Sequence, residues 1–116
     1  MDKLITSSPT TLRWLSTIEA KVKEKNLSFK YSEAKYYASF WSPKTKRNIA
    51  YLHPQKTQIR LFTRLSPSFN SALQTTPSSS KWADMYPSIF KVRSEDSINK
   101  AIEFIINSYE EDSHVY

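Results

Sequence analysis

The chain of 116 residues contains no cysteine and no glycine. Without cysteine it cannot form disulfides, thiolate metal sites or a cysteine nucleophile, a composition typical of a reducing interior. Without glycine it lacks the glycine-rich loops that hold phosphates and dinucleotides. It has no apolar run near the roughly 18 residues of a membrane span, and its first nine residues lack the apolar block of a signal peptide. We therefore expect a cytoplasmic protein with no membrane partner.

Carboxylates are absent from the middle of the chain. Residues 34–83 carry eight Lys and Arg side chains and no Asp or Glu, whereas residues 94–116 carry six acids and one Lys. The net charge is +6, and with 39% hydrophobic and 14% aromatic residues the chain can form a core. The charge therefore belongs to a folded surface. We expect one domain over residues 1–116, with an ordered core at about 8–110.

Helices are predicted at both ends of the chain. The first, 9–26, begins after Ser8, and its apolar stripe is Leu12, Leu15, Ile18 and Val22. The second begins after Ser94 with two acids in its first turn, which complement the helix dipole. Its apolar stripe is Ile98, Ala101, Ile102, Ile105 and Tyr109, widened by Phe104 and Ile106. We expect residues 111–116 to form a frayed acidic tail.

Four strands are predicted between the helices, at 36–41, 48–53, 57–65 and 89–93. The third strand alternates most clearly, with Ile59, Leu61, Thr63 and Leu65 on one face and Gln58, Arg60, Phe62 and Arg64 on the other. The fourth strand likewise divides into Phe90 and Val92 against Ile89, Lys91 and Arg93. The first strand is ambiguous, because either Tyr36, Ala38 and Phe40 or Tyr37, Ser39 and Trp41 could face the core. The Ser/Thr/Pro-rich segment 66–81 is expected to be a long loop, either a lid over the sheet or a plain connection.

The predicted order of elements is α-β-β-β-loop-β-α. It indicates an α+β fold with an antiparallel sheet of about four strands and both helices packed on one face. The other face would then be bare, and it would carry Arg60, Arg64, Lys91 and Arg93. Charged side chains can serve there simply to keep an exposed sheet soluble and unpaired. That explanation does not account for the absence of Asp and Glu from residues 34–83.

Two stretches resemble a bacterial and archaeal family called domain of unknown function 5655. They are residues 48–56 followed by Ile59-Arg60-Leu61-Phe62, and Phe90-Lys91-Val92-Arg93-Ser94-Glu95 with the closing helix to Tyr109. The resemblance covers roughly residues 30–110 and implies a shared fold. It implies no chemistry, although members labelled as predicted transport proteins resemble accessory domains beside endonuclease-like regions. That association favours nucleic acid as a ligand by analogy.

Catalytic motifs are incomplete in this chain. Glu33-Ala34-Lys35 matches half of a nuclease motif, but the upstream Asp that would complete a Mg²⁺ site is missing. His53 and His114 are the only histidines, too few for a zinc site without several carboxylates, and we interpret His53 as a hairpin residue. No Ser/His/Asp arrangement is evident. We expect a binding module rather than an enzyme, with no catalytic residue, metal or cofactor.

The main hypothesis is that the bare face binds DNA, RNA or another polyanion, with arginine and lysine on phosphates and aromatic rings on bases. The candidate residues are Arg60, Phe62, Arg64, Lys91, Arg93, Tyr37 and Trp41. An alternative is that the same face is a protein interface, used for a homodimer or an acidic partner. A third hypothesis is a small-molecule pocket between the long loop and the sheet, with Trp82 and Tyr86 on its rim. Trp14 and Trp82 otherwise serve as core or loop anchors.

Overall fold

Two long helices and six strands make up the computed structural model, which describes residues 3–26, 29–80 and 83–115. The helices are α1 (Pro9–Asn26) and α2 (Ile98–Val115), and two short 3-10 helices are η1 (Pro67–Phe69) and η2 (Glu95–Ser97). The strands are β1 (Lys30–Glu33), β2 (Ala38–Ser42), β3 (Arg47–Pro54), β4 (Ile59–Thr63), β5 (Gln74–Thr75) and β6 (Ser88–Val92). In the described ranges, no helix combines the length and the apolar character needed to cross a bilayer.

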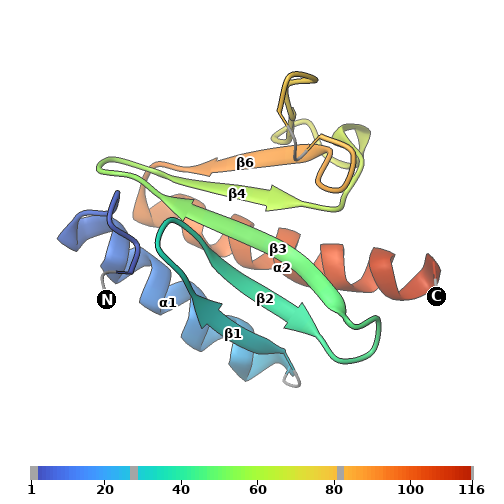
Figure 1. Cartoon of the computed structure of the whole chain (residues 1–116), viewed down its shortest axis with the longest axis horizontal. Coiled ribbons are helices and arrows are strands. Elements are labelled where there is room, and N and C mark those ends of the chain that lie inside the picture. Colours follow the sequence, from blue (N-terminus) through green and yellow to red (C-terminus); the bar gives the residue numbers. More distant parts are fainter. Residues whose placement is uncertain (1–2, 27–28, 81–82, 116) are drawn as a thin grey trace.

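The strands form one antiparallel sheet in the order β1-β2-β3-β4-β6-β5. Both helices pack against the same face of this sheet (Figure 1). The predicted α+β fold is therefore confirmed, but the expected number of strands is too low. The prediction missed β1 and β5 because both are short and polar, so neither has an alternating apolar pattern.

The core lies between the sheet and the helices. Ile59 and Leu61 of β4 and Val92 of β6 are fully buried in it, as the alternation predicted. In β2, Ala38 and Phe40 face the core, whereas Tyr36, which was grouped with them, precedes the strand and is 43% exposed. A register shift between Phe40 and Trp41 marks a β-bulge, and Trp41 pairs with Asn48 beyond it.

The predicted helix stripes account for most of the contacts on the helix side of the core. In α1, Leu15, Ile18 and Val22 are buried, whereas Leu12 is 40% exposed. Ser8 begins this helix: its hydroxyl accepts a hydrogen bond from the Thr11 amide and donates one to the Lys56 carbonyl. In α2, the buried apolar residues are Ile98, Ala101, Ile102, Phe104 and Ile105, with Tyr109 packed beside them.

Two predicted irregular segments are more ordered than expected. The expected frayed tail is wrong for residues 111–115, because α2 continues to Val115 and Asp112 is 3% exposed. Within the predicted loop 66–81, η1 is followed by β5, which pairs with β6. The hydroxyl of Thr76 also donates to the Tyr86 carbonyl at 2.6 Å. The described part of this segment is therefore attached to the edge of the sheet.

Candidate functional site

The sheet face opposite the helices is called here the open face. It carries a small aromatic cluster. Phe62, Tyr86 and Ile89 are buried in this cluster, with Tyr37 and Tyr51 packed beside them. The rings of Tyr51 and Tyr86 lie 5.2 Å apart in an edge-to-face arrangement. Tyr86 comes from the segment before β6, so the open face is not bare as expected. Phe62 is only 4% exposed, and the expectation that it offers a stacking surface is wrong.

The Arg64 side chain is largely buried and holds neighbouring segments of the open face together. It is 9% exposed. The guanidinium donates to the carbonyl of Asn48 at 2.8 Å, to the carbonyl of Met85 at 3.4 Å and to the hydroxyl of Tyr86 at 3.2 Å. The prediction that Arg64 presents a free charge is therefore wrong, because its guanidinium is held by the carbonyl groups of Asn48 and Met85 and by the hydroxyl of Tyr86.

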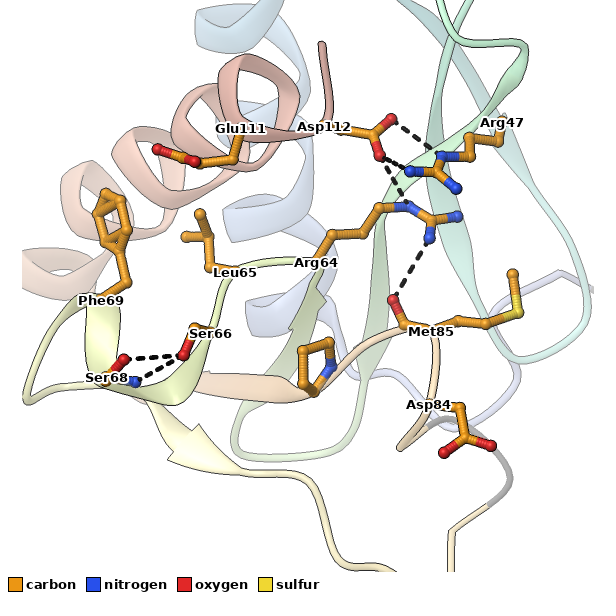
Figure 2. Close-up of a pocket in the computed structure, with 11 residues that line it drawn as sticks. Arg47, Arg64, Leu65, Ser66, Ser68, Phe69, Asp84, Met85, Glu111 and Asp112 are labelled. Carbon is orange, nitrogen blue, oxygen red and sulfur yellow. Dashed lines mark hydrogen bonds and ion pairs between the residues drawn. The ribbon is translucent and has the colours of Figure 1, made fainter. Parts of the chain in front are cut away.

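Asp112 joins Arg64 and Arg47 in a partly buried ionic cluster near the end of α2 (Figure 2). Its carboxylate accepts hydrogen bonds from two guanidinium nitrogens of Arg47, and one of its oxygens lies 3.9 Å from Nε of Arg64. Burial alone would raise the pKa of Asp112. The hydrogen bonds and charges of Arg47, together with the charge of Arg64, outweigh this effect and hold that pKa below its ordinary value. Arg47 and Arg64, two of the basic residues in 34–83, are thus partly neutralised by Asp112 of the acidic segment 94–116.

Three cations remain on the open face, Arg60, Lys91 and Arg93, and together with the neighbouring His53 they form a row across three strands, called here the basic row. His53 of β3 is paired with Arg60 of β4, and Arg60 is paired with Lys91 of β6. Arg93, two residues beyond Lys91, is exposed, and its Nε donates to the Gln58 side chain at 3.0 Å. Of the described residues, none places a carboxylate within ion-pairing distance of Arg60, Lys91 or Arg93. The basic row is therefore a concentration of positive charge without a counter-charge in contact.

Partial burial affects the hydrogen bonding of Arg60 and the pKa of His53. The Arg60 guanidinium lies 5.5 Å from the ring centroid of Phe62, and its buried Nε has no hydrogen-bond partner within the described part of the chain. Burial, and to a lesser extent the charge of Arg60, lower the pKa of His53 below its ordinary value. His53 is consequently neutral at pH 7, and an anion placed beside it would favour its protonated form.

Aromatic residues adjoin the row at one end. The Tyr37 ring lies 5.0 Å from the His53 ring and 6.2 Å from that of Tyr51. The preceding residue, Tyr36, is 43% exposed, and Nζ of Lys35 lies 5.6 Å from its ring centroid. Trp41 lies four residues further along the chain than Tyr37, under the Lys30 ammonium at 5.2 Å, toward the other end of the open face.

The structure therefore brings together Arg60, Lys91, Arg93 and Tyr37 from the predicted site. It places Phe62 and Arg64 in buried positions and Trp41 apart from the row. The sequence interpretation missed His53, which is paired with Arg60. His53 could have been found from its spacing two residues after Tyr51, which puts both on the same face of an extended strand.

A pocket of about 590 Å³ lies beside the ionic cluster, where Phe69 and Met85 contribute exposed apolar side chains (Figure 2). It lies between η1, the segment before β6 and the end of α2. Tyr86, expected on the rim of a small-molecule pocket, is buried in the aromatic cluster instead, and Trp82 lies outside the described residues. Ser66, Ser68, Arg64 and Asp112, four of the polar residues that line this pocket, already bond to neighbouring groups.

Metal-binding groups are not gathered anywhere in the described ranges: no set of three His, Asp or Glu residues lies close enough to hold an ion. Glu33, from the incomplete nuclease motif, accepts a hydrogen bond from the Tyr31 hydroxyl at 2.8 Å. Comparisons with protein-family models, with curated proteins and with solved structures each found no match. The resemblance to domain of unknown function 5655 therefore stays a prediction.

Proposed function

We propose that this protein is a non-catalytic binding module of the cytoplasm that binds nucleic acid through the basic row. The observation that carries the proposal is the set of three cations, Arg60, Lys91 and Arg93, side by side on the open face, with no carboxylate of the described residues in ion-pairing contact. Phosphate groups are the natural counter-charges for such a set, and released counterions would supply much of the binding free energy.

The distribution of charge over the two layers supports this choice. The segment 94–116, which includes α2, contains six acids and one Lys, and α2 covers the sheet face opposite the basic row. Most acids of this segment thus lie on the helix side of the sheet, away from the basic row. A surface that only needed to stay soluble would intersperse both signs, as most protein surfaces do.

The burial of Phe62 argues against the alternative that the open face is a protein interface. Interfaces depend on exposed apolar anchors, and Phe62 is buried while Trp41 is half-buried beneath Lys30. The large hydrophobic residues that are exposed in the described ranges are Ile5, Leu12, Tyr36, Phe69 and Met85. None of these belongs to the aromatic cluster.

Titration of an oligonucleotide at several salt concentrations tests the proposal. Three phosphate contacts predict that log affinity falls against log salt concentration with a slope of about −2 for a single strand or about −3 for a duplex. The double variant Arg60→Glu/Lys91→Glu should weaken binding by tenfold or more. The matched control is Lys21→Glu/Lys25→Glu, which makes the same change in net charge on exposed positions of α1. Equal loss in both double variants, or no salt-dependent binding by the native protein, would refute the proposal.

A further inference from the structure

We propose that the basic row holds the phosphate at the end of a nucleic acid strand, a phosphate monoester, between Arg60 and Lys91. This inference rests on the proposed function and names the group of the polymer that the site recognises. Three features of the row carry it: its cations converge on a small area, the two central cations lack a counter-charge, and the positive charge does not continue along the strands.

The side chains of the row converge because they come from directly opposed positions of neighbouring strands. Arg60 is opposed to Lys91 on one side and to His53 on the other. The Thr76 amide donates to the Pro87 carbonyl at 2.9 Å, so the odd-numbered residues of β6 direct their backbone groups toward β5 and away from β4. Arg60 and Lys91 therefore form a non-hydrogen-bonded pair, whose Cβ atoms lie about 4.5 to 5.5 Å apart. Two long cationic side chains at this separation can contact the same phosphate group.

The pair of Arg60 and Lys91 is unfavourable for the fold when no anion is bound. Like charges directly opposite each other destabilise a sheet, and no carboxylate of the described residues lies within ion-pairing distance of either side chain. The buried Nε of Arg60 also lacks an acceptor in the described ranges, which costs further free energy. A phosphate between the two side chains would remove both penalties, because it supplies negative charge and several acceptor oxygens.

The positive charge of the row does not continue along the strands. On one side, the next residues of the open face belong to the aromatic cluster, which is uncharged. On the other side, the Gln58 side chain accepts a hydrogen bond from Arg93 and donates one to Gln55. A protein that binds the middle of a strand needs a cationic groove that follows the backbone. The row instead concentrates its charge on one or two phosphates, which suits the end of a strand.

The charges of a strand end also match those of the row. A phosphate monoester carries about −1.5 to −2 at pH 7, whereas a phosphodiester carries one negative charge. Arg60 and Lys91 together balance the monoester. The exposed Arg93, two residues beyond Lys91, is placed to contact the phosphodiester that follows. His53, on the other flank of Arg60, adds a ring nitrogen that can donate to the terminal phosphate.

The test compares three forms of one internally labelled oligonucleotide by fluorescence anisotropy: with a 5′-phosphate, with a 3′-phosphate, and with hydroxyl groups at both ends. One phosphorylated form at least should bind the native protein roughly fivefold more tightly than the hydroxyl form, and the comparison of the two shows which end is held. Lys91→Gln should reduce this preference to about twofold or less, because one of the two cations at the terminal phosphate is lost.

Arg93→Gln is the matched control, since it removes a cation of the row that lies away from the terminal phosphate. It should weaken binding of all three forms by a similar factor and keep the preference, and circular dichroism should show both variants folded. A preference lost in Arg93→Gln but kept in Lys91→Gln would overturn the assignment. Equal affinity of the native protein for the three forms would overturn this inference while the proposed function stands. Failure of all three forms to bind would overturn the proposed function itself.

Discussion

Replacing Asp112 by Asn tests whether the end of α2 is held by the ionic cluster. The carboxylate side chain is 1% exposed and faces two guanidinium groups, one of them 9% exposed. The substitution removes the negative charge but keeps a side chain of the same size. It therefore leaves Arg64 in a buried position without its counter-charge.

The expected cost is about 2 to 3 kcal/mol of unfolding free energy. Removing one partner of a buried ion pair commonly costs about 3 to 5 kcal/mol. Water reduces this value here because the Arg47 side chain is 32% exposed, and the Asn carbonyl can still accept one hydrogen bond. For a chain of this length, such a loss corresponds to a fall in melting temperature of about 10 °C.

Urea unfolding, followed by circular dichroism at several pH values, measures this cost. Because the pKa of Asp112 is lowered in the folded chain, its ionised form stabilises the fold above the unfolded pKa, and this stabilisation is lost as the pH falls through the folded pKa. The difference between native protein and variant should thus be constant from about pH 5 to 7 and shrink below about pH 4. Glu111→Gln, at the exposed neighbouring position, should change stability by less than about 0.5 kcal/mol. A difference that stays the same at low pH, or a value equal to that of Glu111→Gln, would refute the reasoning.

Two further predictions concern β3 and its contacts. Ser108 is fully buried, and its hydroxyl donates to the Ile49 carbonyl at 2.7 Å and accepts from the Arg64 amide at 3.0 Å. Ser108→Ala should therefore cost about 2 kcal/mol in urea unfolding, whereas the exposed Ser68→Ala should be nearly neutral. Since the pKa of His53 is lowered, a bound phosphate that favours its protonated form should make affinity rise as the pH falls below about 6.5, and His53→Gln should abolish this rise. Parallel pH profiles for the native protein and His53→Gln would show that His53 does not contact the ligand.

Local patterns were enough to predict the helices and the central strands. The interval of α1 is the predicted one, and the alternation of Ile59 and Leu61 correctly placed the core face of β4. These features depend on residues a few positions apart, which the chain itself specifies. The bounds of β1 could not be predicted in the same way, because its four residues are stabilised by pairing with β2 and not by a pattern of their own.

The candidate site was predicted less well because its residues contact others that are far away in the sequence. Alternation put Phe62 and Arg64 on the open face, which is correct, but it could not reveal that Tyr86 covers that face. The ion pair between Asp112 and Arg47 could not be predicted either, because the net charge of a segment does not show which charged residues contact each other. Arg60, Lys91 and Arg93 were found because they lie on β4 and at β6, where alternation and strand pairing agree.

The borders of the sheet determine how copies of this protein can meet. β1 offers four residues along one border; along the other, β5 offers two residues and pairs only with Ser88 and Ile89, so the rest of β6 continues that border. β1 and β5 are short and polar, and unpaired amides and carbonyls on such strands are poor templates for a second sheet. Concentrated solutions of the purified protein should therefore resist fibril growth by addition of a second sheet at the β1 border.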